Sequence, residues 1–480
     1  MAEQTILYLT FFAYLFLIFV IGIVAWLRTN TLSDYILGGR TLGKWTTAIS
    51  AGASDMSGWL LLGLPGYAYL AGMEAIWIII GLFIGTACNW YLVAPRLRQD
   101  TETLDNSLTI PEYFEHRFND HTHLLRIISA LIILLFYFFY TSSGLVAGGK
   151  LFESVFGISY TWSVVFGAGT ILIYTCLGGF LAVSWSDLIQ GLLMALALTV
   201  VALLAINQLN GFGSLYQSMQ IINFELTDPF TEVDGQALGI IGIVSLLGWG
   251  LGYFGQPHIL IRFMATDHIK HIPAARRIAL SWTALGLIAA LIIGFSGLAL
   301  LPQHLNDADS EKVFIELLSV LLHPLPAGIC LAAILAAIMS TADSQLLVAS
   351  SAITEDMFKT FKKDASDQSQ VSVGRIAVVI LTIAATVLSL QPNNKVLDLV
   401  AYAWAGFGAA FGPVILFALF KKQLSRSSAL MGMLSGGLTV IIWKNIQIDN
   451  SIFELYELVP GFVFACLTIF LVNQIQKSTN

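Results

Sequence analysis

The sequence predicts an all-helical protein that crosses a membrane many times. Of its 480 residues, 57% are hydrophobic and only 11% are charged, and the mean hydropathy is +0.79. In a soluble domain, about a quarter of the residues are charged. Long apolar runs also recur along the whole chain, and a helix needs about 20 such residues to cross a bilayer. Together these observations predict an all-α polytopic membrane protein.

The apolar runs divide the chain into about thirteen expected spans. These cover residues 5–27, 44–71, 74–95, 125–150, 158–178, 187–207, 236–257, 277–301, 326–352, 372–391, 396–420, 428–446 and 452–473. The first run is too long for the apolar core of a signal peptide, so we interpret it as a span. Because the connecting segments are mostly short, we expect one transmembrane domain over residues 1–480.

The basic residues predict how the spans are oriented. If the N-terminus lies outside and the spans alternate, 19 of the 23 lysines and arginines fall in inner segments, Arg262 among them. Inner loops of membrane proteins carry such an excess. The expected topology therefore has the N-terminus outside and the C-terminus inside.

The second span contains a polar stretch, SAGASDMSGW, from Ser50 to Trp59. Glycine and serine allow a membrane helix to open, because small side chains and hydroxyls tolerate or re-satisfy the freed backbone groups. An open turn exposes carbonyl oxygens, which bind a hard cation such as Na⁺. Asp55 at this depth costs at least a few kcal/mol unless it is paired or solvated. The alternative is that Asp55 only hydrogen-bonds to a neighbouring helix.

The ninth span contains the second polar stretch, AAIMSTADSQLL. Ala337, Ser340 and Thr341 are spaced so that one helical face presents one carbonyl and two hydroxyls. Neutral oxygens suit a monovalent cation better than Ca²⁺ or Mg²⁺. The alternative is a kink with hydroxyls bonded to their own helix. Because interrupted spans indicate a transport site, we expect the second and ninth spans to be interrupted and to bind Na⁺ together at mid-membrane.

The seventh span carries a glycine-rich aromatic stretch, SLLGWGLGYFGQPHI. Trp249 and Tyr253 lie four residues apart on one face, and Pro257 follows one turn later. The GxxxG spacing is typical of a helix-packing face. The alternative is a second opened helix that presents two aromatic walls to a small substrate.

Seven stretches carry a resemblance to a known family. They read DYILGGRTLG, SAGASDMSGWLLLGLPG, LRIISALIILLF, GGFLAVSWSDLIQ, GWGLGYFGQPHIL, MSTADSQLLVASSAITED and YAWAGFGAAFGPVILF. In these stretches the chain resembles the sodium:solute symporter family, most closely its bacterial proline-transporting members. The resemblance implies a non-enzymatic, multi-pass protein of the bacterial inner (plasma) membrane. It would take up L-proline with Na⁺ as the coupling ion, by symport through alternating access, without nucleic acid or an obligate protein partner.

The resemblance also implies a LeuT-like fold of two inverted five-helix repeats. The first repeat would cover residues 44–207 and the second residues 236–420. One extra N-terminal helix, residues 5–27, would precede them. Two extra C-terminal helices, residues 428–473, would follow.

The same resemblance assigns roles to individual residues. The coupling Na⁺ would be bound by the carbonyls of Ala53, Met56 and Ala337 and the hydroxyls of Ser340 and Thr341. Asp55, Ser57 and Gly58 would lie beside the ion and the substrate. The substrate pocket would be lined by Tyr140, Trp249, Tyr253 and Pro257. Arg40 and Asp187 are expected to act in gating or coupling, Arg40 at the inner mouth.

A second cation site is a separate hypothesis. Asp187 and Ser344 would form a cation stop on the inner exit path, and Asp343 would strengthen it. Asp343 departs from the small neutral residue that the resembled transporters carry there. The alternative is that Asp343 faces an aqueous inner vestibule and binds nothing.

Other functions stay open at this stage. The solute need not be proline, because no residue excludes another small molecule. Proton coupling is the serious alternative, since Asp55 could titrate, although Ala337, Ser340 and Thr341 have no proton to exchange. An enzyme is disfavoured because the histidines fall in loops or at span ends. A channel is disfavoured because no filter-like repeat occurs.

Overall fold

The structure is a computed structural model that describes most of the chain, namely residues 2–26, 36–177, 179–307, 309–362, 364, 366–391, 394–421, 423–446, 448 and 452–479. Residues 27 and 178, which end two predicted spans, lie outside the described residues. In the described part, all regular structure is helical apart from two isolated β-bridges. The predicted all-helical class is confirmed.

The long helical segments follow the order of the predicted spans. They are α1 (Ala2–Trp26); α3 (Lys44–Asp55), η2 (Trp59–Gly63) and α4 (Leu64–Ala71); α5 (Ile76–Cys88), η4 (Asn89–Val93) and α6 (Ala94–Thr103); α8 (Leu124–Phe156); α9 (Tyr160–Leu177); α10 (Phe180–Gln208); α12 (Gly239–Gly248), η6 (Trp249–Gly255) and α13 (Pro257–Ala265); α14 (Ile272–Leu300); α16 (Pro324–Ser351) and η9 (Ala352–Phe358); α18 (Asp367–Ser389); α19 (Val396–Phe420); α20 (Arg426–Asn445); and α21 (Leu458–Thr479).

Shorter helices lie mostly in the connections, and the sequence did not predict them as separate elements. They are η1 (Gly38–Arg40), η3 (Gly72–Ala75), α7 (Ile110–Arg117), α11 (Phe212–Ile222), η5 (Phe224–Thr227), η7 (Ile269–His271), η8 (Ser310–Lys312), α15 (Val313–Leu321), α17 (Lys359–Phe361) and η10 (Ile452–Glu454). Of these, η10 falls within the predicted span 452–473, and η3 overlaps the predicted span 74–95. The longer of the short helices are amphipathic or polar segments, which a search for long apolar runs does not detect.

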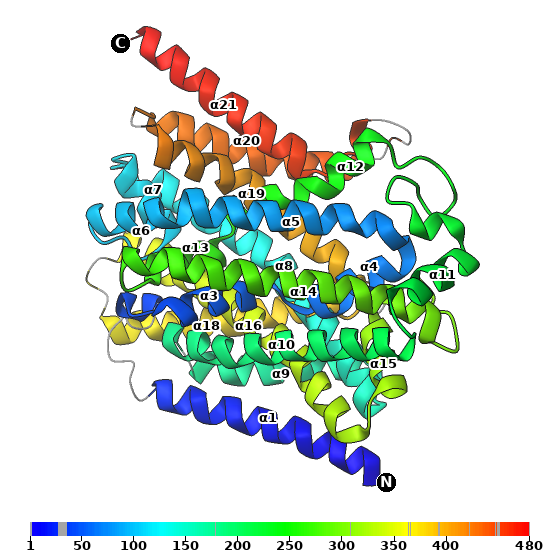
Figure 1. Ribbon diagram of the computed structural model, residues 1–480. Coiled ribbons are helices and arrows are strands. Elements are labelled where there is room, and N and C mark those ends of the chain that lie inside the picture. Colours follow the sequence, from blue (N-terminus) through cyan, green and yellow to red (C-terminus); the bar gives the residue numbers. More distant parts are fainter. Residues whose placement is uncertain are drawn as a thin grey trace.

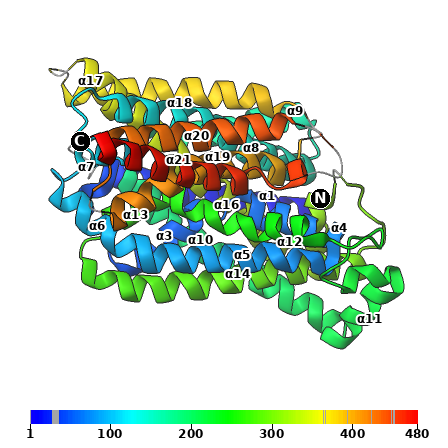
Figure 2. The same ribbon diagram turned by 90° about the horizontal axis from the view of Figure 1, so that it is seen from above.

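The long helices lie side by side in one bundle, with α1 and α21 at opposite edges (Figure 1). The two termini lie at opposite ends of the bundle (Figure 2). Nine helices of the described chain are long and apolar enough to cross a membrane, or ten if the bent pair α12–η6 and α13 is one span. The chain is therefore a multi-pass membrane protein.

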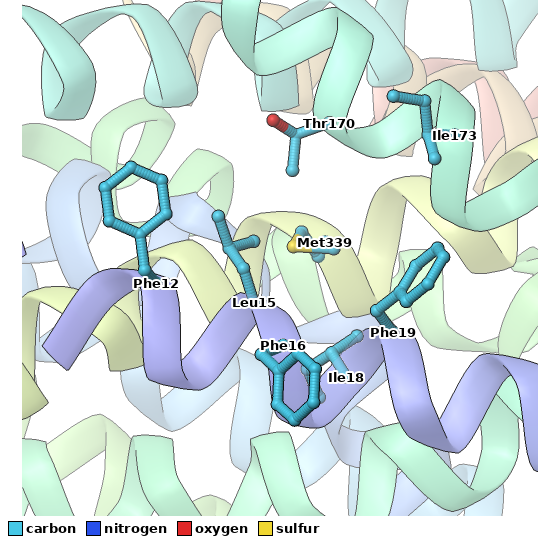
Figure 3. A pocket seen from close by; sticks show the side chains of 8 residues that line it. All are labelled: Phe12, Leu15, Phe16, Ile18, Phe19, Thr170, Ile173 and Met339. Atoms are coloured by element: carbon cyan, nitrogen blue, oxygen red, sulfur yellow. The ribbon is translucent and has the colours of Figure 1, made fainter. Parts of the chain in front are cut away.

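Helix α1 packs along α16, beside the predicted sodium ligands. An apolar groove of about 490 Å³ lies between α1, α9 and α16. Its lining includes Phe12 and Phe16 of α1, Thr170 of α9 and Met339 of α16 (Figure 3). Ser340, the predicted sodium ligand that follows Met339, is fully buried and bonds to the Ala53 carbonyl of α3, so it lies inside the bundle.

The second span is broken where the polar stretch predicts. α3 ends at Asp55, and Met56 leaves the helix with φ −82° and ψ 80°. The chain turns through Ser57 and Gly58 before it re-enters a helical path at η2. A Cβ on Gly58 would lie 2.6 Å from the Cβ of Ala147, so the break packs closely against α8. The carbonyl of Asp55 is thereby freed from the α-helical ladder.

The seventh span is also broken, as the opened-helix alternative predicted for its backbone. α12 passes into the 3₁₀ segment η6, and α13 follows after a bend of 44°. Pro257 is the first residue of α13, a position where its missing N–H costs nothing. The glycines of η6 also pack closely: a Cβ on Gly250 would lie 2.1 Å from the carbonyl oxygen of Gly81, and one on Gly255 would lie 2.2 Å from that of Phe407. The segment is both opened and a packing face.

The ninth span is not interrupted, and that part of the prediction was wrong. α16 runs unbroken from Pro324 to Ser351. The Ser340 hydroxyl lies 3.1 Å from the Ala337 carbonyl, and the Ser344 hydroxyl donates to the Ser340 carbonyl at 2.7 Å. Hydroxyls bonded to their own helix leave the backbone ladder intact. The interrupted pair is therefore the second and seventh spans.

Candidate functional site

The predicted sodium ligands of the second and ninth spans lie together. The Ala53 carbonyl at the end of α3 accepts hydrogen bonds from the Ser340 hydroxyl at 2.8 Å and the Thr341 hydroxyl at 3.2 Å, both on α16. Ser340 also bonds to the Ala337 carbonyl. Met56 lies at the break, and all five residues are buried. This set of neutral oxygens fits a desolvated monovalent cation, because the hydroxyl oxygens keep lone pairs to offer it.

Asp55 joins the two broken spans. Its Oδ2 accepts a hydrogen bond from the Tyr253 hydroxyl in η6 at 2.7 Å. Its main-chain carbonyl, freed by the break, accepts from the indole N–H of Trp59 at 2.9 Å and the hydroxyl of Tyr140 at 3.4 Å. Oδ1 of Asp55 is buried without a hydrogen-bond partner. A buried carboxylate oxygen in this state is a strong acceptor for a cationic or N–H group.

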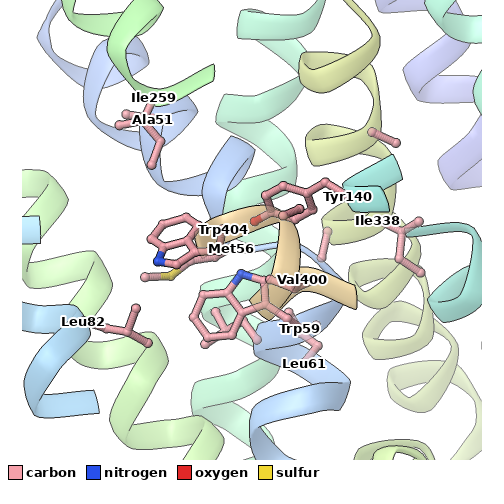
Figure 4. Packing of buried hydrophobic residues seen from close by; sticks show 14 of the residues in the cluster. Ala51, Met56, Trp59, Leu61, Leu82, Tyr140, Ile259, Ile338, Val400 and Trp404 are labelled. Carbon is pink, nitrogen blue, oxygen red and sulfur yellow. The ribbon is translucent and has the colours of Figure 1, made fainter. Parts of the chain in front are cut away.

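Aromatic side chains surround the break in the second span. Figure 4 shows Trp59, Tyr140 and Trp404 gathered around Met56. The Trp404 ring packs edge-on against Tyr253 with centroids 5.0 Å apart. Its indole N–H donates to the Trp249 carbonyl at 2.7 Å. The result is a buried aromatic cage around Asp55, contributed by η2, α8, η6 and α19.

Of the four predicted pocket residues, Tyr140 and Tyr253 belong to this cage, whereas Trp249 and Pro257 have no bond to Asp55 in the described part of the chain. Tyr140 and Tyr253 both contact Asp55 directly. Trp249 stacks instead on Tyr456, the residue two before α21, with centroids 5.3 Å apart. Pro257 is the first residue of α13 and directly follows Gln256, where the bent span resumes as a helix. Trp249 therefore lies between the cage and the C-terminal helices.

Asp187 forms an ion pair that the sequence did not reveal. Arg262 of α13 donates from Nη2 to Asp187 Oδ2 at 3.1 Å, and both side chains are fully buried. The same nitrogen contacts the Ser344 hydroxyl at 2.5 Å. Ser50 donates to Asp187 Oδ2 at 2.6 Å. Arg262 was expected in an inner loop, and this was wrong because the seventh span continues to Ala265 and carries Arg262 into the bundle.

Asp343 bonds to Thr175 and not to the Asp187–Arg262 ion pair. Its Oδ1 accepts a hydrogen bond from the hydroxyl of Thr175 on α9, and its Oδ2 is buried without a hydrogen-bond partner. The Thr175 hydroxyl also lies 2.8 Å from the Ile171 carbonyl. Asp343 is fully buried. It does not face an aqueous vestibule in this conformation.

Arg40 ties together the end of the bundle where α3 begins. It has a positive φ of 53° and donates to the Asn106 side chain at 2.8 Å, the Ser107 carbonyl at 2.9 Å and the Met264 carbonyl at 2.5 Å. Burial and the nearby Arg98 lower the pKa of Arg40 to about 10, so it stays charged at neutral pH. Since Met264 belongs to α13, Arg40 links the loop before α3 to the second half of the seventh span.

The comparison with protein families decides the class of this site. Residues 35–436 match the model of the sodium:solute symporter family. The chain belongs to this family. A sodium:solute symporter is a transporter and not an enzyme, and its coupling ion is Na⁺. The predicted family and the predicted sodium dependence are confirmed.

Relatives of this symporter extend over nearly its full length. The sodium/proline symporter of Escherichia coli K12 is 49% identical over all of this chain and 95% of its own. The sodium/proline symporter of Staphylococcus aureus USA300/TCH1516 is 45% identical over 98% of this chain and 93% of its own.

Solved structures support the fold of this symporter. A Na⁺-coupled sialic acid symporter, in a substrate-bound outward-open state, matches with a TM-score of 0.79 at 21% identity, covering 98% of both chains. MhsT in complex with L-phenylalanine matches with a TM-score of 0.52 at 14% identity, covering 89% of this chain and 97% of its own. The architecture is that of LeuT-like transporters.

Four residues of the symporter site were missed from the sequence. Trp59, Trp404 and Tyr456 are aromatic residues in apolar segments, where most aromatics only fill the core. Only for Arg262 did the sequence contain a pattern that could have placed the residue in the site. It follows Pro257 by five residues, and a helix that starts at Pro257 would place it one turn and a half inside the bundle.

Proposed function

We propose that the protein is a Na⁺/proline symporter that takes up L-proline by alternating access across the cell membrane of a bacterium. One structural observation carries the proposal: the Ala53 carbonyl on α3 and the Ser340 and Thr341 hydroxyls on α16 meet in a buried cluster of neutral oxygens. The proline preference rests on relatives at 45–49% identity that are named sodium/proline symporters. Lipid surrounds the bundle, and no obligate protein partner is required.

The proposal includes the topology. The thirteen spans place the N-terminus outside and the C-terminus inside. Residues 44–207 and 236–420 form the two inverted repeats, preceded by the helix of residues 5–27 and followed by the two of residues 428–473. The termini at opposite ends of the bundle support an odd number of crossings. In this arrangement each broken span is the first helix of its repeat, so the two breaks fall at corresponding positions of the two repeats.

Sodium couples to proline by bridging the repeats. The ion binds carbonyls of α3 in the first repeat and hydroxyls of α16 in the second, so it stabilises only the conformation that brings them together. A ligand of equal affinity for two conformations shifts neither, so this differential binding is what drives the cycle. Entry of one Na⁺ across 100 mV releases about 2.3 kcal/mol. A tenfold gradient adds about 1.4 kcal/mol, enough for accumulation of several hundred-fold.

Proline would bind at the breaks, beside Asp55, Ser57 and Gly58. The buried Oδ1 of Asp55 has no hydrogen-bond partner and would accept from the ammonium of the substrate. The N-termini of η2 at Trp59 and of α13 at Pro257 favour an anionic group, here the proline carboxylate. Tyr140, Tyr253, Trp249 and Pro257 would enclose the ring. A different small amino acid is the alternative substrate, because these contacts recognise the ammonium and carboxylate groups, which all amino acids share, more than the proline ring.

Asp187, Asp343 and Ser344 remain a proposed second cation stop on the inner exit path. In this conformation Arg262 contacts both Asp187 and Ser344, so a cation would use the stop only after the guanidinium has moved. Asp343 would then contribute its free Oδ2. Arg40 would act as a gate at the inner mouth through its contact with Met264.

Uptake by proteoliposomes tests the proposed function. We expect labelled proline to accumulate when Na⁺ is outside, to stay near equilibrium with K⁺ outside, and to respond to a Na⁺ gradient without a pH gradient. Accumulation driven by a pH gradient alone would establish proton coupling instead. Competition by other small amino acids in the same assay measures the substrate range, and lithium in place of sodium tests the ion selectivity.

A further inference from the structure

Arg262 is a buried arginine whose bonds join four helices. Its Nε donates to the Ser50 hydroxyl of α3 at 3.1 Å, and its Nη2 contacts Asp187 of α10 and Ser344 of α16. Nη1 donates to the His258 carbonyl of its own helix α13 at 2.8 Å. The guanidinium also lies over the Phe180 ring, 5.2 Å from its centroid. Neither Arg262 nor Asp187 has any exposed surface.

The guanidinium lies one helical turn from the sodium cluster on both helices that form it. On α3, Ser50 precedes Ala53 by three residues; on α16, Ser344 follows Ser340 by four. Since α3 runs away from the predicted inner side and α16 runs towards it, both steps lead in the same direction, inward. A bond network connects the two levels, because the Ser344 hydroxyl donates to the Ser340 carbonyl. Arg262 therefore lies between the sodium cluster and the inner face.

The charge of Arg262 matches the place it occupies. Asp187 is a fully buried carboxylate, and removing one partner of a buried ion pair leaves a strongly unfavourable charge. A cation beside Asp187 is therefore strongly favoured as long as this carboxylate is buried and ionised. Arg262 fills this position in this structure, and the arginine belongs to α13, the second half of a broken span. A sodium ion that leaves the cluster inward would therefore meet the positive charge of the Arg262 guanidinium between Asp187 and Ser344.

We propose that Arg262 is the inner sodium gate: its guanidinium seals the exit path by holding the position between Asp187 and Ser344, and Na⁺ passes only when α13 withdraws it. The sodium ion and the guanidinium then occupy this position in turn. This inference rests on the proposed function, because the inward direction and the passage of Na⁺ are both taken from it.

Sodium entry without proline tests the gate. In proteoliposomes, a closed gate allows little ²²Na⁺ to enter when proline is absent. We expect Arg262→Gln to raise this proline-independent ²²Na⁺ entry at least about tenfold over wild type, while ²²Na⁺ binding to the detergent-solubilised protein is kept. Arg262→Lys restores one charge but not the bridge, so its leak should be intermediate. A residue with a purely structural role would not open a leak.

Two further variants keep the test decisive. Arg262→Gln leaves Asp187 unpaired and can impair folding, so the double variant Asp187→Asn/Arg262→Gln removes both charges together and should also leak. Arg98→Gln is the matched control, because Arg98 is a buried arginine that bonds to the Thr266 carbonyl just after α13 and does not contact Asp187. A folded double variant that binds ²²Na⁺ but admits no more of it than wild type would overturn the gate. A wild type without Na⁺-driven proline uptake would instead overturn the proposed function.

Discussion

The two proposed cation positions of this transporter lie one helical turn apart along α3 and α16, but they differ in chemistry. The sodium cluster consists of neutral oxygens from Ala53, Ser340 and Thr341. The inner position consists of the Asp187 carboxylate with Ser50 and Ser344, and Arg262 fills it. The pair shows how one transport path can hold a mobile ion and a tethered one.

The difference follows from what each position costs when no ion is present. The hydroxyls of Ser340 and Thr341 donate to the Ala53 carbonyl, so the neutral cluster satisfies itself and can release sodium at little expense. The Asp187 carboxylate cannot do this, because an unpaired buried charge costs several kcal/mol. The first position therefore suits an ion that must come and go, and the second suits a counter-charge that belongs to the protein itself.

The largest expected effect comes from breaking the neutral cluster. Ser340→Ala and Thr341→Ala each remove one oxygen, and a bond to a charged group contributes about 1.5–3 kcal/mol. Combined, they should raise the Na⁺ concentration for half-maximal uptake about 100-fold or more. Ser351→Ala is the control, since this buried α16 hydroxyl bonds only within its helix to the Leu347 carbonyl. A double variant with wild-type sodium dependence would place the ion elsewhere.

Trp249→Ala separates substrate binding from the neutral cluster. If Trp249 encloses the substrate, proline uptake at low concentration should be lost, with half-maximal uptake requiring at least about 30 times more proline, as for a buried aromatic anchor. ²²Na⁺ binding should change little. Trp443→Ala serves for comparison, because Trp443 bonds to the Leu455 carbonyl away from the cage. Equal loss of sodium and proline binding would mean that Trp249 is structural, acting through its stack on Tyr456.

Tyr253→Phe should have a smaller effect on the same pocket. The substitution removes only the hydroxyl that donates to Asp55 Oδ2. Loss of a hydrogen bond to a charged group, about 1.5 kcal/mol, corresponds to roughly tenfold weaker proline binding. Titration of labelled proline binding measures this directly. Unchanged affinity would show that Asp55 does not need Tyr253 to hold its position.

Asp343→Asn should have the smallest effect and sharpens the account of the inner position. Asp343 bonds to Thr175 and lies outside the Arg262 contacts, so we expect only about a threefold rise in the sodium concentration for half-maximal uptake. The matched change Asp187→Asn should be far more severe. Unchanged sodium affinity and stoichiometry in Asp343→Asn would remove this residue from the second cation stop.

The local breaks in the helices were partly predictable from sequence. The second span combines glycines, serines and an aspartate in an apolar run, and the helix ends there. The seventh carries glycines followed by Pro257, and it opens there too. In the ninth span the same reasoning failed, because serine and threonine can bond to their own helix without breaking it. Small residues and proline change the backbone, whereas hydroxyls alone do not.

The pairing of Arg262 with Asp187 could not be predicted in the same way. The partners are 75 residues apart and belong to different repeats of the proposed fold. The count of basic residues assigned Arg262 to a loop, because a charged residue normally ends an apolar span. Only the helical path after Pro257, which depends on tertiary packing, carries it inward. The meeting of Ala53 with Ser340 and Thr341 was easier to predict, because each half is a local pattern on one helix.

Equilibrium ²²Na⁺ binding to the purified protein, without proline, tests the central claim most directly. If the carbonyls of α3 and the hydroxyls of α16 hold the coupling ion, wild type should bind Na⁺ saturably, and the Ser340→Ala/Thr341→Ala protein should lose that binding at the same Na⁺ concentrations while it remains folded. Wild-type binding by the folded double variant would contradict the account.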